Sequence, residues 1–180
     1  MKRILIYIVL SLLLVSCSDG IKNEAMGMFL LPGINYGDDV EKLIDNGVVQ
    51  LKHLSPEGKY YSLNATVYGY DFSKGKDVLS VITENGKIID VSLSAQIPYE
   101  IYTGDEMPAA IKMAMTLEDE LTTKIGTPTK IQELNFIYKT EETKLVWKKN
   151  GLKYELRLTP GPQNIFWEIN YSVESSKDDV

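Results

Sequence analysis

Two of the three Asn-Gly pairs, Asn85-Gly86 and Asn150-Gly151, constrain the fold of this chain more than any other feature of its sequence. Asn-Gly is the preferred loop of a two-residue β-hairpin, because a type I′ turn needs positive φ at both loop positions. Each pair lies between runs of alternating apolar and polar residues, at Val78–Glu84 and 87–95 for the first pair and at Thr143–Lys149 and 152–158 for the second. The sequence therefore predicts two antiparallel hairpins.

The two-residue loops also predict which side chains share a face of each hairpin. Counting outward from Asn150-Gly151, Trp147 opposes Tyr154 and Leu145 opposes Leu156. Side chains alternate along a strand, so these apolar residues share one face, which we expect to lie under a helix. In the first hairpin, the core stripe is expected at Ile89, Val91, Leu93 and Ala95.

Two segments have the periodicity of amphipathic helices. The first is short: Val40, Leu43 and Ile44 share a face, Asp38 is the expected N-cap, and Asn46-Gly47 ends the helix. The second is expected at about 105–125, with Gly126 at its end and Pro128 preventing its continuation. Its predicted stripe is Ala110, Ala114, Leu117, Leu121 and Ile125, with Ile111 and Met115 beside it.

Further strands are expected at 48–54, 60–72, 130–139 and 165–173. The order of elements is then helix, strands, helix, strands. We predict an α+β fold in which helices cover one face of antiparallel sheet, arranged as two tandem helix-plus-three/four-strand repeats at 29–100 and 101–174, with a flexible tail at 175–180.

The N-terminal segment has the pattern of an export signal. Lys2 and Arg3 precede twelve almost wholly apolar residues at 4–15. This run is long enough for the core of a signal peptide and too short for a membrane span of about 20 residues. Residues 1–16 are therefore predicted to be a signal peptide that is removed.

The sequence Leu14-Val15-Ser16-Cys17 resembles the bacterial lipobox. The resemblance implies that a lipid is attached to the Cys17 thiol, that the chain is cut before this residue, and that residues 17–28 form a polar tether. Two or three acyl chains anchor a protein stably to a membrane. Ser18 follows the cysteine where Asp would favour inner-membrane retention, so the resemblance favours the outer membrane, with the domain facing the periplasm or the cell surface.

Composition limits the classes of partner. Lys2 and Arg3 leave with the signal, so the mature chain of 164 residues has 17 basic and 25 acidic residues, a net charge of −8. Nucleic-acid binding without sequence specificity needs a basic footprint, so we expect no nucleic-acid partner. Cys17 is the only cysteine, which excludes a disulfide within the mature chain.

Two short motifs carry a resemblance to a known family. They are Gly33-Ile34-Asn35-Tyr36-Gly37-Asp38-Asp39-Val40 before the short helix and Leu121-Thr122-Thr123-Lys124-Ile125-Gly126-Thr127-Pro128 at the end of the long one. Both resemble the repeats of β-lactamase-inhibitor-protein-like domains and of the small outer-membrane-assembly lipoproteins (SmpA/OmlA). The first half lacks the Gly-x-Pro of the second. The resemblance implies non-enzymatic protein binding through an open sheet face.

Catalytic and metal-binding residue sets are not apparent. His53 is the sole histidine and lies in a predicted strand, so we interpret it as a partly exposed strand residue. A single histidine and a single cysteine exclude multi-His and Cys/His metal sites. Solvated surface accounts for the acidic pairs, which are Asp38/Asp39, Asp119/Glu120, Glu141/Glu142 and Asp178/Asp179. We expect no catalytic residue, no metal and no cofactor other than the lipid on Cys17.

One face of the second hairpin has an unusual charge pattern. Lys148 opposes Lys153 and Lys144 opposes Arg157, although like charges directly opposed across strands cost on the order of 0.2–1 kcal/mol per pair. Val146 and Glu155 lie between these pairs, and the next strand adds Phe166 to the face. A second stripe, of Tyr60, Tyr68 and Tyr70, is expected in the first half, where tyrosine would suit an interface.

Two interpretations of these stripes remain open at this point: a docking surface for an acidic partner or anionic glycan, and a solvated face in which Glu142, Glu155 and Glu168 neutralise the lysines. The corresponding hypotheses for function are a membrane-anchored module that binds a protein of the cell envelope, a binder or hydrolase of envelope glycan or a small ligand, and a structural subunit of an envelope assembly. The sequence leaves the oligomeric state open.

Overall fold

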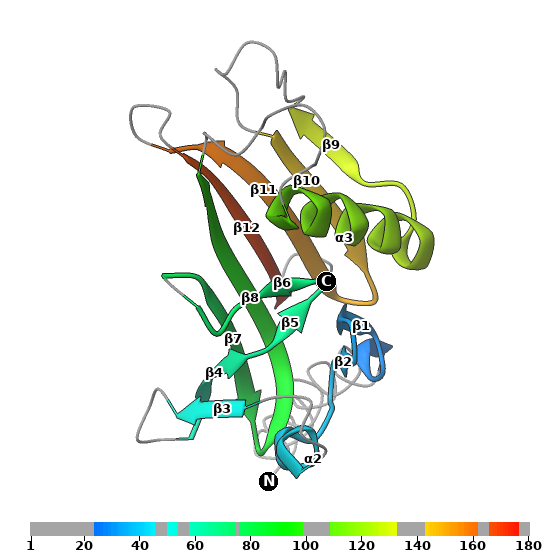
Figure 1. Ribbon diagram of the computed structural model, residues 1–180. Helices are drawn as coiled ribbons and strands as arrows, with labels where there is room; N and C mark the ends of the chain where they lie inside the picture. The colour runs from blue at the N-terminus through cyan, green and yellow to red at the C-terminus, as the bar shows by residue number, and fades with distance from the viewer. Residues whose placement is uncertain are drawn as a thin grey trace, which may run out of the picture.

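The computed structural model describes residues 24–45, 50–53, 58–74, 76–98, 109–132, 143–161 and 166–176. The predicted signal, Cys17 and most of the predicted tether lie outside these residues. The main element is an eight-stranded antiparallel sheet in the order β3-β4-β7-β8-β12-β11-β10-β9 (Figure 1). Its strands are β3 (Gln50–His53), β4 (Tyr60–Asn64), β7 (Val78–Glu84), β8 (Lys87–Pro98), β9 (Thr129–Gln132), β10 (Thr143–Lys149), β11 (Leu152–Pro160) and β12 (Phe166–Ser175).

Smaller elements accompany this sheet. Two short antiparallel pairs join β1 (Phe29–Leu31) to β2 (Ile34–Asn35) and β5 (Thr66–Val67) to β6 (Tyr70–Asp71). The helices are α2 (Val40–Asp45) and α3 (Ala109–Ile125). The described chain therefore combines antiparallel sheet with helices, as the α+β prediction required.

Both predicted hairpins are confirmed. Asn85 and Gly86 have φ values of 53° and 74°, and Asn150 and Gly151 have 51° and 72°, as a type I′ turn needs. The register of the second hairpin is also as predicted, because Trp147 pairs with Tyr154 and Leu145 with Leu156.

The core stripe of the first hairpin differs from the prediction near its turn. Ile82 and Thr83 are consecutive in β7, but their partners are Asp90 and Ile88, so Ile89 is an extra residue in β8. The bulge reverses which side chains face the core beyond it. Val91, Leu93 and Ala95 are buried as expected, whereas Ile88 is buried in place of Ile89.

The short helix begins one residue later than predicted. The backbone N–H of Glu41 donates to Oδ1 of Asp39 at 3.1 Å, which makes Asp39 the N-cap. The Asp38 side chain instead closes the preceding turn, because its Oδ2 accepts the N–H of Asn35 at 2.7 Å. The predicted end at Asn46-Gly47 lies outside the described residues.

The long helix confirms most of its predicted stripe. Ala110, Ile111, Ala114, Leu117 and Leu121 are buried, Ile125 packs partly against the core, and the helix ends before Gly126. Met115, expected beside this stripe, is 47 % exposed. Met113 is fully buried instead, since it lies three residues after Ala110 and four before Leu117 and so shares their face.

The alternating run at 60–72 does not form one strand. β4 ends at Asn64, and Tyr68 and Gly69 then form the turn of the small β5–β6 hairpin, with φ values of 47° and 84°. Ala65 accepts the backbone N–H of Phe72 at 2.9 Å, which closes this hairpin. Tyr60 therefore lies in the main sheet, while Tyr68 and Tyr70 leave it.

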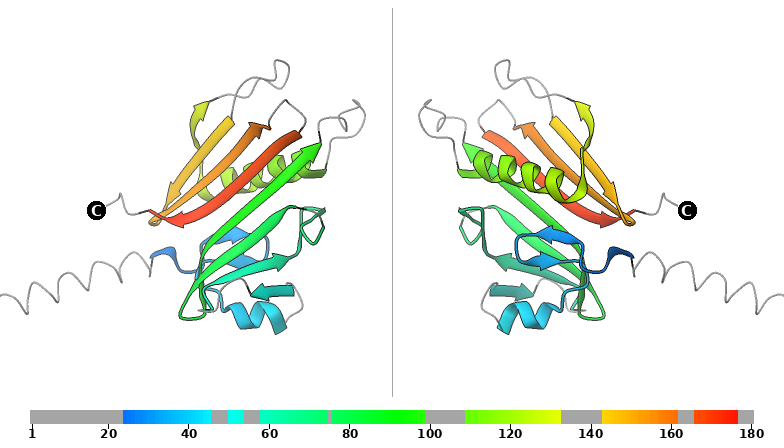
Figure 2. Two further views of the ribbon diagram at one scale, coloured as in Figure 1. Left: turned by 90° about the vertical axis from the view of Figure 1, so that its left-hand side faces the viewer. Right: turned by 90° about the vertical axis from the view of Figure 1, so that its right-hand side faces the viewer.

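The core lies between one side of the sheet and the elements packed on that side, which are α3 and the two short strand pairs. Figure 2 shows α3 crossing one side of the strands β8 and β10 to β12, and α3 contacts β8 and β10. Alternate residues of β12 face this core: Trp167, Ile169, Tyr171 and Val173 are buried. The Tyr171 hydroxyl donates to the carbonyl of Leu30 at 2.7 Å, which ties β1 to the sheet.

Both ends of the described chain meet at the Asn150–Gly151 turn. The Asn150 side-chain amide donates to the carbonyl of Glu24 at 3.1 Å, and the Ser176 N–H donates to the carbonyl of Gly151 at 2.7 Å. Ala25 is already buried in the core. The packed part of the chain thus begins before residue 29 and extends to Ser176.

Candidate binding surface

The candidate site lies on the side of the sheet turned away from α3, which we call the outer face. In β12 the residues that alternate with the buried ones are partly exposed, and they are Phe166, Glu168, Asn170 and Ser172. Cross-strand partners share a face, so Arg157 and Lys144 follow Asn170 across the sheet, and Glu155 follows Ser172.

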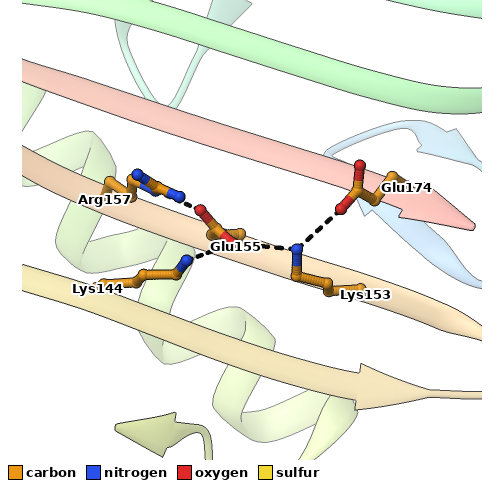
Figure 3. A network of polar contacts seen from close by, with 5 residues as sticks. All are labelled: Lys144, Lys153, Glu155, Arg157 and Glu174. Atoms are coloured by element: carbon orange, nitrogen blue, oxygen red, sulfur yellow. Dashed lines mark hydrogen bonds and ion pairs between the residues drawn. The ribbon is translucent and has the colours of Figure 1, made fainter. Parts of the chain in front are cut away.

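Three cations of the outer face converge on one carboxylate. Lys144 and Lys153 place Nζ at 3.0 Å and 3.2 Å from Oε2 of Glu155, and Arg157 donates through Nε to Oε1 (Figure 3). Lys153 also pairs with Glu174 at 2.9 Å. We call these five residues the Glu155 cluster. In Figure 3 the cluster lies in front of the strands and α3 lies behind them.

This geometry explains how the sheet tolerates opposed like charges. Lys144 opposes Arg157 and Lys148 opposes Lys153, as the register predicted. Glu155 lies between the two pairs and is only 7 % exposed. Burial opposes ionisation of its carboxyl, but hydrogen bonds from Lys144, Arg157 and Lys153 outweigh burial and hold the pKa of Glu155 below its ordinary value. Hydrogen bonding to Glu174 raises the pKa of Lys153.

A hollow of about 270 Å³ lies next to this cluster, at the centre of the sheet. Its floor consists of short polar side chains from the two central strands, which are Ser92 and Ser94 of β8 and Asn170 and Ser172 of β12. Arg157 and Glu155 form one wall, and Val78 lines the opposite side. We call this feature the central hollow.

The hollow forms because the side chains of its floor are short, while the side chains that flank it are longer. Ser92 is exposed and shares a 2.7 Å hydrogen bond between hydroxyls with Ser80 of β7. The hollow therefore offers hydroxyl and amide groups, one guanidinium and one exposed aliphatic side chain. This mixture suits an extended polar segment better than a flat apolar surface.

The predicted tyrosine stripe is wrong for two of its three members. Tyr60 is exposed on the outer face of β4. Tyr68 occupies a turn, and its hydroxyl is buried. Tyr70 donates to Asp77 and packs edge-on against Phe72 at a centroid distance of 5.0 Å, so burial and this hydrogen bond raise the pKa of Tyr70. Both leave the stripe because the strand breaks at Ala65.

Phe166 lies at the other end of β12 from the Asn150–Gly151 turn, and its ring packs on Gly161 so closely that a Cβ there would overlap it. The structure therefore brings Lys144, Lys153 and Arg157 together and leaves Tyr60 and Phe166 at the margins of the face. Lys148 is exposed beside the turn. The serines of the hollow were missed, although Ser92 and Ser94 alternate along a strand as residues of one face should.

Other sequence candidates add no chemistry to this face. His53 lies in β3, at the edge of the described sheet, and its backbone pairs with Tyr61 of β4. Glu120 pairs with Lys124 on α3 at 2.6 Å, and Asp39 with Lys87 at 3.3 Å. The pairs Glu141/Glu142 and Asp178/Asp179 lie outside the described residues. Within the described part of the chain, no three His, Cys, Asp or Glu side chains gather as a metal site would require, and neither helix has the length and apolarity to cross a membrane.

Comparison with protein families, with curated proteins and with solved structures found no match for this chain.

Proposed function

We propose that this protein is a membrane-anchored, extracytoplasmic lipoprotein that binds a protein of the cell envelope through the outer face of its sheet. The signal-like residues 1–16 and Cys17 support the anchor. The central hollow carries the binding proposal, because it combines an accessible polar floor with the Arg157 guanidinium at the middle of the sheet. The domain acts without catalysis in this proposal, and its role is to hold the partner at a membrane surface, preferentially the outer membrane.

The strand order supports a two-repeat origin for the face. Each half of the described chain has a helix followed by four strands of the main sheet, α2 with β3, β4, β7 and β8, and α3 with β9 to β12. In each half, the first strand lies at an edge of the sheet and the later strands follow in chain order toward the centre. The last strand of one half, β8, therefore pairs with the last strand of the other, β12. An approximate twofold axis between the antiparallel strands β8 and β12 would relate the halves and place a helix over the same side in each.

The two Asn-Gly turns do not support this relationship. Asn85-Gly86 joins the third and fourth strands of the first half, whereas Asn150-Gly151 joins the second and third strands of the second half. Strand order, rather than turn position, is therefore the argument for two diverged copies. The central hollow would then lie at the seam between them, since β8 and β12 form its floor.

A lipid on Cys17 would also orient the domain. Glu24 is the seventh residue after Cys17, and an extended chain of seven residue steps spans at most about 25 Å. Glu24 is held by Asn150, so the Asn150–Gly151 turn would face the membrane. The outer face would then be oriented perpendicular to the membrane surface, and a partner could reach it from the side.

Photo-crosslinking in living cells of the source bacterium tests the binding proposal. A photoreactive phenylalanine replaces Ser92 or Ser172 on the outer face, and Lys112 or Thr122 on the exposed side of α3 in the matched controls. We expect both outer-face probes to capture the same envelope protein, identified by mass spectrometry, and the α3 probes to miss it. Capture from α3 alone, or different products from Ser92 and Ser172, would contradict the proposal.

The second candidate is a binder of cell-envelope glycan. The hydroxyl and amide groups of Ser92, Ser94, Asn170 and Ser172 favour it, because such groups pair with sugar hydroxyls. Binding of the mature protein to envelope glycan fragments, with loss on Asn170→Ala, would favour this candidate. Turnover of those fragments would instead indicate a hydrolase, and co-migration in a large detergent complex a structural subunit.

A further inference from the structure

The Glu155 cluster has more positive than negative charge although the chain as a whole is acidic. Lys144, Lys153 and Arg157 face two carboxylates, Glu155 and Glu174. Exposed Lys148, which opposes Lys153, adds another cation to the same face. The mature chain carries a net charge of −8, and Glu168 and Asp90 also lie on the outer face, so this positive excess is confined to the cluster.

Glu155 organises these cations before any ligand arrives. Each of its carboxylate oxygens has a cationic partner, and its own side chain is nearly buried. Cations that are already held lose less conformational freedom when a ligand binds, and so more of the interaction free energy appears as affinity. The side chains of Lys144 and Arg157 are 24 % and 42 % exposed, so both remain within reach of solvent.

Arg157 connects the cluster to the central hollow. It lines the hollow together with the hydroxyls of Ser92 and Ser172 and the amide of Asn170, which can donate hydrogen bonds to a ligand, whereas the Ser94 hydroxyl donates to Glu168. Guanidinium groups bind carboxylates through charge-assisted hydrogen bonds, which are shorter and stronger than those between neutral groups. An acceptor with negative charge is therefore the chemistry that this wall and floor would recognise.

Two carboxylates limit how much negative charge the same lining can accept. Glu155 lies on the wall, and Glu168 precedes Asn170 along the outer face and accepts a hydrogen bond from Ser94 at 3.5 Å. A doubly charged phosphate would meet more repulsion from these carboxylates than a carboxylate ligand would. On the opposite side, Val78 is 45 % exposed and offers an apolar contact beside the anion position.

We propose that the Glu155 cluster and the central hollow form a carboxylate subsite, which receives an Asp or Glu side chain from an extended acidic segment of the partner protein. The apolar neighbour of that acidic residue packs on Val78. This inference rests on the proposed binding function and names the chemistry of its partner, and the tests of the two are separable.

Fluorescence anisotropy with labelled peptides tests the subsite on the mature protein extracted in non-ionic detergent. The probe is a six-residue glutamate peptide with capped ends, and the matched peptide has six glutamines. We expect the glutamate peptide to bind at least tenfold more tightly, and Arg157→Gln to remove most of that preference. Lys112→Gln is the matched control, because it removes one exposed positive charge from α3 and should leave the preference unchanged.

Lys144→Gln provides a second variant in case Arg157→Gln alters the fold, and circular dichroism melting compares both with the wild type. Equal affinity for the two peptides, or equal effects of Arg157→Gln and Lys112→Gln, would overturn the carboxylate subsite. Inorganic phosphate that competes better than the same concentration of acetate would also overturn it, in favour of a phosphate site.

The outcomes distinguish this inference from the proposed function. Crosslinking of one envelope protein at Ser92 and Ser172, together with no glutamate preference, would refute the subsite and support the binding face. A glutamate preference that depends on Arg157, together with no common crosslinked partner, would support the subsite and refute the proposed partner-binding role.

Discussion

Two buried tyrosines, Tyr154 and Tyr171, provide a matched test of how the core is stabilised. Both point toward α3 from neighbouring strands, and both are essentially unexposed. The Tyr171 hydroxyl donates to the Leu30 carbonyl at 2.7 Å, whereas the Tyr154 hydroxyl finds no hydrogen-bond partner in the part of the chain that the structure describes. Burial raises the pKa of both hydroxyls, so each is neutral at physiological pH.

Replacing each tyrosine by phenylalanine removes one oxygen from an otherwise unchanged ring. For Tyr171→Phe, the loss of a buried hydrogen bond and of the donor to Leu30 should lower the free energy of unfolding by about 1–3 kcal/mol. For Tyr154→Phe, the removed hydroxyl was desolvated without a hydrogen bond, so the free energy of unfolding should stay the same or rise by about 1 kcal/mol. The free energies of unfolding of the two variants should therefore differ by about 1–4 kcal/mol.

Urea unfolding followed by circular dichroism measures this difference, with equal m-values as the check that both variants unfold from the same state. Because Leu30 belongs to β1, Tyr171→Phe should also loosen the N-terminal segment, which amide hydrogen exchange would detect at Leu30 and Leu31. Equal stability of Tyr171→Phe and the wild type, or an equal loss in both variants, would refute this account of the core.

Three further predictions concern charge and turns. Glu155→Gln should remove the part of the wild type's acid sensitivity that arises from the lowered pKa of Glu155. The stability that this carboxylate contributes is present above the ordinary pKa of 4.5 and is lost as the pH falls through the folded-state pKa. Unfolding curves between pH 6 and pH 2 should therefore differ between the two proteins. Asp90→Asn should stabilise the protein at pH 7, because burial raises the pKa of Asp90 and one of its oxygens is buried without a partner among the described residues. The gain in stability should vanish below the ordinary pKa of 3.8. A gain that stays constant with pH would contradict this reasoning. Gly86→Ala should lower the free energy of unfolding by about 1 kcal/mol because of the φ of 74° alone, since no neighbouring atom lies within 4 Å of the added carbon. Asn85→Gly is the control, because it relaxes the same turn.

Local features of the fold were predictable where a single turn decides the outcome. Asn150-Gly151 determined the register of its hairpin, and this register brought Lys144, Glu155 and Arg157 onto one face. The errors arose where one residue shifts a pattern. The bulge at Ile89 exchanged it for Ile88 in the core, and Tyr68-Gly69 formed a turn although tyrosine favours strands.

Long-range pairing could not be predicted from the same signals. The strands β8 and β12 lie far apart in the sequence, and no turn connects them, so local periodicity carries no information on their register. Their pairing places Ser92 beside Ser172 and Ser94 beside Asn170, which makes the floor of the central hollow. The three cations around Glu155 were therefore predictable from one hairpin, whereas a prediction of the central hollow would have required the strand order of the whole sheet.

The proposed role depends on an anchor at Cys17, because the anchor provides the address at which a partner is met. Intact-mass measurement of the protein purified from membranes of its source organism tests this claim most directly. The account predicts a chain that begins at Cys17 and carries the added mass of two or three acyl chains. A chain that retains Met1, or one that begins at Cys17 with an unmodified thiol, would contradict it.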